Sequence, residues 1–179
     1  MIFITLGTQK FQFNRLLKAV DDLISANSIS EKVFAQIGYS DYKPKNYSYK
    51  DFLSREEFQI TMDRCDKVIT HGGTGAIISA VKHGKKVIAI ARLKEFGEHV
   101  DNHQLQIVKQ FKELDFIDSV DDISDLEKVI KRLDKEEFRT YKSSNTKVVN
   151  SIENYIHEID QKSSIRISHE KMINYMGGK

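Results

Sequence analysis

The stretch VITHGGTGAIISAVKHGKKVIAI, residues 68–90, contains the succession of elements that decides the fold class. The apolar, β-branched runs KVIT at 67–70 and KVIAI at 86–90 predict two buried strands. Between them, residues of about 75–83 predict a helix that stops at Gly84, where helices commonly end. Two strands joined through a helix make a βαβ unit with parallel strands, so the stretch predicts an α/β fold.

The same alternation continues toward the amino terminus. IFITL at 2–6 and KVFAQI at 32–37 predict strands, and a helix of about 11–26 separates them. Apolar residues of that helix recur at helical spacing and predict one core-facing side, made of Phe13, Leu16, Leu17, Val20, Leu23 and Ile24.

Two helix starts carry a predicted capping box, in which a serine is followed three residues later by a glutamate. Ser54 and Glu57 begin a short helix ending near Arg64, after an extended piece near Tyr47 to Tyr49. Ser124 and Glu127 predict the same cap for a helix of 125–134. A helix of about 100–113 and a short strand at Phe116-Ile117 precede that last helix.

The length of 179 residues predicts one domain, and 40% hydrophobic residues are enough for a core. We expect residues 1–144 to form a Rossmann-like domain, with a doubly wound, mostly parallel sheet. Residues 145–179 have weak helical period followed by a polar tail, and we expect a C-terminal helix there that docks a partner or simply closes the domain.

The composition excludes several classes of function. A net charge of +2 lacks the broad cationic surface of a nucleic-acid-binding protein. No run approaches the about 18 apolar residues of a membrane helix, and no basic segment precedes the apolar start. The single cysteine, Cys65, excludes an intrachain disulfide. We therefore expect a soluble, unexported protein.

A glycine-rich turn follows the strand at 67–70. Ligands of open α/β sheets bind beyond the carboxyl ends of the strands, and a helix that opens there presents unpaired N–H groups. A tight connection needs some glycine even without a ligand, but three glycines in four positions after a histidine favour a phosphate or diphosphate site. The predicted site residues of this turn are His71, Gly72, Gly73, Thr74 and Gly75.

Two better-known phosphate loops do not match this turn. No Gly-Lys-Ser/Thr follows the glycines, which excludes the P-loop. The dinucleotide fingerprint would need its third glycine at Ile78, and no acidic residue closes the strand at Ala89-Ile90.

Two further segments follow strand ends. The sequence ARLKEFGEHVDNHQ, 91–104, gathers groups that suit hydrogen bonding to sugar hydroxyls or, for arginine, to phosphate, although each could also be an ordinary solvated loop residue. The candidates here are Arg92, Glu98, His99, Asp101, Asn102, His103 and Gln104, to which the first strand end adds Gly7 and Thr8. His99 and His103 are four apart and raise the option of a metal site, but no His-Glu-x-x-His pattern or third ligand is evident, so we predict none.

Residues 68–104, with the opening FITLGTQKFQFNRLL at 3–17, closely resemble the C-terminal domain of family 28 glycosyltransferases. The nearest members are small catalytic subunits of bipartite enzymes. One group serves bacterial capsule and exopolysaccharide assembly, and the other is the eukaryotic subunit that adds the second N-acetylglucosamine to dolichol diphosphate.

The resemblance implies the nucleotide-sugar-binding half of a GT-B enzyme, with Gln104 nearest the sugar. The expected reaction is inverting transfer of galactose, N-acetylglucosamine or glucuronic acid from a UDP-sugar to a polyprenyl-diphosphate-linked saccharide, in surface polysaccharide synthesis and without a cofactor. A membrane-anchored subunit would bind the acceptor and recruit this cytoplasmic chain to the inner face of the membrane.

The chain departs from many relatives at Ser79, where they carry an acidic residue for the ribose hydroxyls. Ribose binding would then be weaker or use Glu98 or Asp101. For the general base, the candidates in this chain are Glu98 and His99, unless the partner supplies it. The alternatives are a non-catalytic stabilising subunit and, disfavoured by the incomplete fingerprint, a nucleotide-dependent oxidoreductase.

Overall fold

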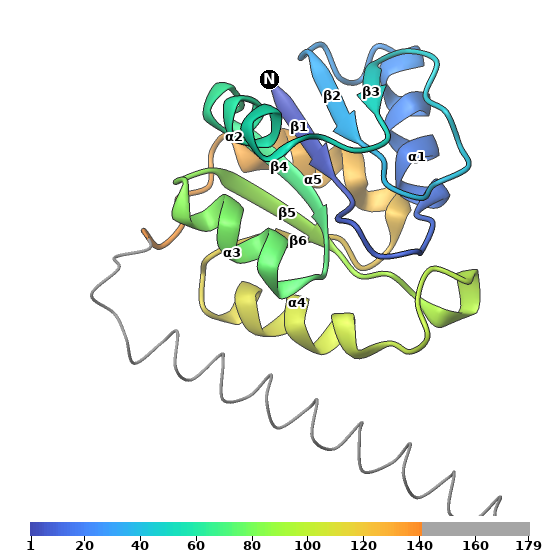
Figure 1. Cartoon of the computed structure of the whole chain (residues 1–179). Helices are drawn as coiled ribbons and strands as arrows, with labels where there is room; N and C mark the ends of the chain where they lie inside the picture. The colour runs from blue at the N-terminus through green and yellow to red at the C-terminus, as the bar shows by residue number, and fades with distance from the viewer. Residues whose placement is uncertain (141–179) are drawn as a thin grey trace, which may run out of the picture. The chain divides into compact units, whose positions relative to one another are not determined.

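A computed structural model describes residues 1–140, which form a six-stranded, all-parallel sheet with strand order β3-β2-β1-β4-β5-β6 (Figure 1). The strands are β1 Ile2–Thr5, β2 Val33–Gln36, β3 Ser48–Lys50, β4 Lys67–His71, β5 Lys86–Ile90 and β6 Asp118–Ser119. The helices are α1 Asn14–Ser25, α2 Arg55–Arg64, α3 Thr74–Lys82, α4 His103–Glu113 and α5 Leu126–Leu133, with 3-10 turns η1 Lys94–Phe96 and η2 Ile123–Asp125.

Helices cover both faces of the sheet, as the doubly wound prediction requires. Helices α1 and α5 pack on one face, where Leu17 and Val129 join a single core with Ile4 and Ile88. Helices α2, α3 and α4 lie on the other face (Figure 1). There Phe58 of α2 packs edge-on against another aromatic ring of the sheet, with the ring centroids 5.4 Å apart.

The order of the strands places a switch point between β1 and β4. From β1 the chain builds outward through β2 and β3, then returns to pair β4 on the other side of β1. Helices leaving β1 and β4 therefore depart to opposite faces and leave a crevice at the carboxyl ends of these two strands. Gly7 and the turn from His71 to Gly75 lie at this point.

Two helices begin later than the sequence predicted, because side chains bind the backbone just before each helix. The helix expected from about residue 11 begins at Asn14, because Ser40 Oγ accepts a hydrogen bond from the Phe13 N–H before the helix starts. The helix expected from about 100 begins at His103, whose N–H donates to Asp101 Oδ1.

The last strand was misplaced by two residues. Phe116 and Ile117 are buried, but Asp118 and Ser119 are the residues that pair with β5. The hydrophobicity of Phe116 and Ile117 reflects their burial, whereas a strand is defined by the hydrogen bonding of its backbone.

One of the two predicted capping boxes forms. Ser54 Oγ accepts from the Glu57 N–H, and the Glu57 carboxylate accepts from the Ser54 N–H. The box predicted at Ser124 was wrong, because Ser124 donates from both its N–H and its hydroxyl to Asp122 Oδ1 and lies in η2.

The predicted C-terminal helix and tail, 145–179, lie outside the described residues. Within residues 1–140, no helix has the length and apolar character needed to cross a membrane.

The two serines make a matched test of this difference. Ser54→Ala should lower the free energy of unfolding by about 1 kcal/mol, because the first turn of α2 loses its cap. Ser124→Ala should change it by less than about 0.5 kcal/mol, since it removes one exposed hydrogen bond. Urea unfolding of both variants measures the difference, and equal losses would contradict the assigned caps.

Candidate ligand-binding site

The switch point is organised around the buried imidazole of His71. Its Nδ1 accepts a hydrogen bond from the Gly73 N–H at 3.0 Å, which leaves the proton of the neutral ring on Nε2. Burial, followed by the charges of Arg92 and His99, lowers the pKa of His71 to about 3. The ring is therefore uncharged at neutral pH.

Two of the site's glycines are needed because this ring is so close. A Cβ at Gly7 would lie 2.7 Å from His71 Nε2, and Gly7 also has a φ of +70°, which favours glycine. A Cβ at Gly73 would lie 2.1 Å from His71 Cε1. The ring thus joins the ends of β1 and β4, and both glycines have a packing role independent of any ligand.

Gln104 also links two strand ends at this edge of the sheet. It is buried, and its Oε1 accepts hydrogen bonds from the N–H groups of Gly72 at 3.0 Å and Arg92 at 3.1 Å. A Cβ at Gly72 would lie 2.8 Å from the Gln104 Cβ. The side chain predicted nearest the sugar therefore holds the ends of β4 and β5 together through its carbonyl oxygen.

The start of α3 supplies free hydrogen-bond donors. The N–H groups of Ala76 and Ile77 donate to Gly73 O, and that of Gly73 donates to His71. Those of Thr74 and Gly75 have no acceptor among residues 1–140. A Cβ at Gly75 would meet no described atom within 4 Å, so this end of the helix is open to a ligand.

Arg92, in the loop after β5, is 1% exposed. Its Nη2 donates to the carbonyl oxygens of Leu6 at 2.8 Å and Phe11 at 3.3 Å. Its buried Nε and Nη1 have no hydrogen-bond partner in the described part of the chain. Burial lowers the pKa of Arg92 to about 10, so the side chain stays cationic at neutral pH.

Glu98 is completely buried and forms a bidentate ion pair with Arg15. Its Oε1 accepts from Arg15 Nε at 3.0 Å, and its Oε2 accepts from Arg15 Nη2 at 2.9 Å. The Leu93 N–H donates a third hydrogen bond, 3.0 Å long, to Oε2. This carboxylate anchors the loop after β5 to α1.

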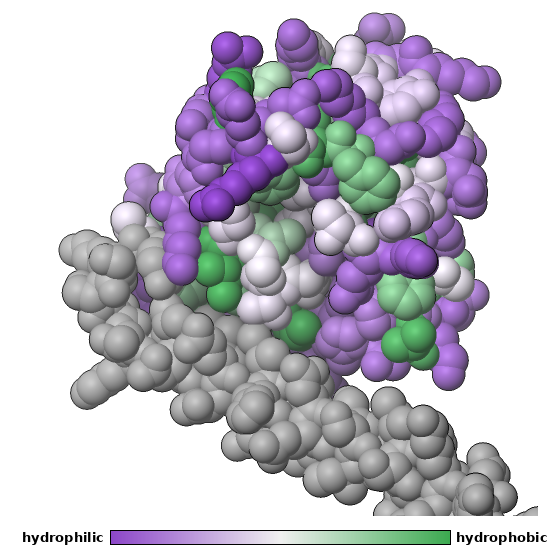
Figure 2. All heavy atoms as spheres, viewed as in Figure 1, coloured by the Kyte–Doolittle hydropathy of each residue, from purple (hydrophilic) through white to green (hydrophobic). Residues whose placement is uncertain are grey.

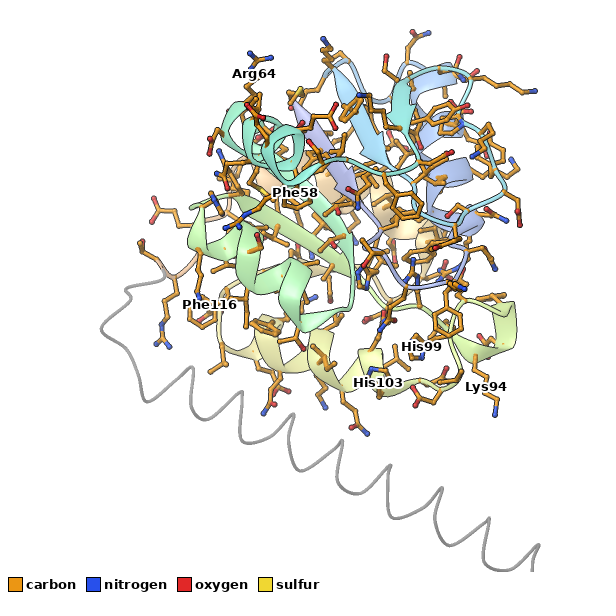
Figure 3. All side chains as sticks on the ribbon, viewed as in Figure 1. Phe58, Arg64, Lys94, His99, His103 and Phe116 are labelled. Carbon is orange, nitrogen blue, oxygen red and sulfur yellow. The ribbon has the colours of Figure 1, made fainter. Side chains whose placement is uncertain are left out.

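Beyond Glu98, the loop carries a cluster of His99, Asp101 and His103 that is partly open to solvent. Figure 3 shows the two histidine rings side by side at the start of α4, and their centroids are 4.7 Å apart. Burial, then the nearby His103, lowers the pKa of His99. Burial alone would raise the pKa of Asp101, but hydrogen bonds from the His103 side chain and N–H outweigh it and lower that pKa.

The remaining predicted residues lie on the surface of the same edge. Thr8 is exposed in the loop after β1. Asn102 is exposed as well, and its Oδ1 accepts from the Lys94 N–H at 2.8 Å, which closes the loop around η1. All the predicted positions therefore gather at the carboxyl ends of β1, β4 and β5, although Arg92, Glu98 and Gln104 are buried there.

Sequence reasoning missed an aromatic pair at this edge. Tyr39, directly after β2, and Phe52, before α2, are 46% and 42% exposed, with ring centroids 5.1 Å apart. The side chain of Gln36 links the region to the switch point, because it donates to Gly7 O and accepts from the Leu53 N–H. The only signal in the sequence was an aromatic residue two positions after the strand predicted at 32–37.

On the face seen in Figure 2, hydrophilic residues predominate and apolar ones form small separate patches. A cavity of about 470 Å³ lies beside the site, between α4 and the ends of β5 and β6, and its apolar lining includes Leu93, Leu105 and Val108.

The buried imidazole makes stability depend on pH. The folded pKa of His71 lies below its ordinary value of 6.5, so the unfolded chain binds the additional proton as pH falls below 6.5. This group's contribution is complete above pH 6.5 and is lost toward its folded pKa, with a slope approaching about 1.4 kcal/mol per pH unit.

Urea unfolding between pH 7 and 4.5 measures that slope. His71→Gln should remove this component, whereas His83→Gln, at an exposed histidine of the turn after α3, should keep it. An unchanged slope in His71→Gln would show that other groups cause the pH dependence.

Solved structures with the same fold identify its class. The glycosyltransferase of kitacinnamycin aligns with a TM-score of 0.57, covering 75% of this chain and 35% of that one at 16% identity. A solution structure of ALG13 aligns with a TM-score of 0.56, covering 83% of this chain and 92% of that one at 20% identity. The fold is that of the C-terminal, Rossmann-like half of a GT-B glycosyltransferase.

The sequence comparison identifies the family. Residues 1–162 match the glycosyltransferase family 28 C-terminal domain, and the chain belongs to this family. The UDP-N-acetylglucosamine transferase subunit ALG13 of Homo sapiens is 26% identical over 116 residues. That match covers 61% of this chain and 10% of the human protein, so the chain spans only a small part of this relative.

Proposed function

We propose that the chain is the donor-binding catalytic subunit of a UDP-sugar-dependent hexosyltransferase. The observation that carries the proposal is the open start of α3, where the N–H groups of Thr74 and Gly75 have no acceptor in the described chain. Family membership supports the transferase class. An anionic diphosphate is the group that such a helix start binds best.

The same donors would assist bond breaking. In inverting transfer an acceptor hydroxyl attacks the anomeric carbon, and negative charge grows on the departing diphosphate. Fixed N–H groups stabilise this charge without having to reorganise. The positive charge of Arg92 adds a favourable electric field at the diphosphate. The Arg92 side chain is only 1% exposed, so it would contact the diphosphate directly only after the loop of residues 6–11 moves.

The rest of the donor would lie across the same edge. The exposed rings of Tyr39 and Phe52 offer an apolar surface to the uracil base. Asn102, which is exposed, offers a polar group to the sugar. Ser79 supplies no carboxylate for the ribose, and the Glu98 oxygens already accept three hydrogen bonds, so neither side chain is proposed to hold the ribose.

The substrates and the partner are proposed by analogy with the relatives. We propose N-acetylglucosamine as the first sugar to test, since the human relative is named for it, followed by galactose and glucuronic acid. The acceptor proposed is a polyprenyl-diphosphate-linked saccharide of surface polysaccharide synthesis. A membrane-anchored glycosyltransferase subunit would bind it and recruit this chain to the cytoplasmic side of the membrane.

The general base is proposed to lie on that partner. Glu98 is buried in its ion pair with Arg15, and the His99 ring packs between Phe11 and His103. A general base must reach the acceptor hydroxyl directly or through one water, which the geometry of Glu98 does not favour.

UDP binding tests the proposed function and separates it from a stabilising subunit that has lost the donor site. UDP at about 100 times its Kd should stabilise the chain by about 2.7 kcal/mol, seen as a higher melting temperature, whereas ADP and NAD should have no effect. Indifference to all three nucleotides would favour the stabilising subunit.

Gly75→Ala locates the diphosphate. The added methyl meets no protein atom, so the fold should be kept while UDP affinity falls about tenfold, or about 1.4 kcal/mol. Ser25→Ala, at the far end of α1, is the control and should bind UDP normally. Isothermal titration gives both affinities, and wild-type affinity in Gly75→Ala would place the diphosphate elsewhere.

His99→Ala tests the location of the base in the reconstituted complex. We expect kcat to fall less than about tenfold, because the proposed general base lies on the partner. Loss of a general base would instead cost about 10² to 10⁴ in rate. A loss in that larger range, with UDP affinity unchanged, would place the base on His99. Glu98→Gln should mainly lower stability, and its transfer rate is compared per folded molecule.

A further inference from the structure

Three side chains on the loop before α4 converge on one point. His99, Asp101 and His103 each direct a potential ligand atom there, and all these atoms lie within 4.8 Å of one another. Asp101 Oδ1 is 3.3 Å from His99 Nδ1 and is hydrogen-bonded to His103 Nδ1. The two histidines suggested a metal site from sequence, and the structure adds the third ligand that was not evident there.

The composition of this cluster suits a transition-metal ion. Two imidazoles and a carboxylate are a usual ligand set for Zn²⁺, with bond lengths of about 2.0–2.2 Å. Ligand atoms around a tetrahedral ion with such bonds are about 3.3–3.5 Å apart. The separation of Asp101 Oδ1 and His99 Nδ1 already has this value, whereas His103 must move away from Asp101 to admit an ion.

The loop holds the three side chains close to this arrangement. Asp101 Oδ1 also accepts the His103 N–H at 3.1 Å, and the His99 ring packs against Phe11 with a centroid distance of 4.7 Å. The buried Glu98 anchors the chain directly before the cluster. Ordered ligands lose little entropy on binding an ion, which raises affinity.

The cluster is accessible as well as ordered. The Asp101 and His103 side chains are partly exposed, so an ion can enter from solvent. Three protein ligands leave at least one coordination position for water or another oxygen ligand.

We propose that His99, Asp101 and His103 form a Zn²⁺-type metal site on this chain. The ion takes the place of the hydrogen bond between His103 Nδ1 and Asp101 Oδ1, and the ring proton of the neutral His103 is then carried on Nε2. The alternative is that Asp101 only orients the two rings through hydrogen bonds. Metal binding by the chain alone, without nucleotide or partner, distinguishes the two and does not depend on the proposed transferase function.

The test is a Co²⁺ titration of the untagged, chelator-treated full chain, followed by visible absorption. We expect one tight equivalent with the bands of a low-coordinate Co²⁺ ion, which Zn²⁺ displaces. His103→Ala and Asp101→Asn should each weaken binding about 100-fold. Two controls should bind normally: His83→Ala, and a double variant of His157→Ala and His169→Ala, which lie outside the described residues.

Unfolding is separated from ligand loss by circular dichroism. Asp101→Asn keeps the side-chain shape, so it decides the outcome if His103→Ala does not fold. Wild-type affinity in the folded Asp101→Asn variant, absence of a tight equivalent, or loss of binding in either control would each overturn the proposal.

Discussion

The carboxyl edge of the sheet depends on one neutral imidazole packed between two glycines. His71 accepts the Gly73 N–H through Nδ1 and lies against Gly7, so a charged ring or a side chain at either glycine would not fit. This contact joins the ends of β1 and β4 at the switch point. The helix α3 begins directly after it, and the N–H groups of Thr74 and Gly75 there have no acceptor among residues 1–140.

Two buried charged side chains, Glu98 and Arg92, hold the loops around this edge. Glu98 and Arg15 form a bidentate pair that connects the loop after β5 to α1, a geometry that is stronger than a single contact. Arg92 donates to the carbonyl oxygens of Leu6 and Phe11 in the loop after β1. These contacts hold the loops of β1 and β5 on either side of the glycine turn. Preorganisation of this kind is what electrostatic stabilisation of a leaving group requires.

The periodic features of the sequence predicted the fold well. Parallel strands, the core face of α1 and the capping box at Ser54 follow from local patterns, because apolar spacing and caps involve neighbours in the chain. Ser124 fits the same capping pattern, but its N–H and its hydroxyl both donate to the nearby Asp122 carboxylate. The strand at 118–119 was misplaced because burial and pairing are separate properties, and only pairing defines a strand.

The sequence predicted that the candidate residues lie at strand ends, but it did not predict their contacts. Sequence reasoning placed His71, Gln104 and Glu98 at a strand end, yet it could not show that they bridge strands or pair with another helix. The partner of Glu98 is 83 residues away in the chain, and no local pattern reports it.

The sequence by itself determined the α/β architecture and the strand ends that carry the candidate site residues, because both depend on local periodicity and chain direction. Only the tertiary structure decided which polar groups remain free for a ligand. Long-range packing occupies the hydrogen-bonding groups of some side chains, such as Glu98. It leaves some backbone groups, such as the N–H groups of Thr74 and Gly75, without an acceptor in residues 1–140.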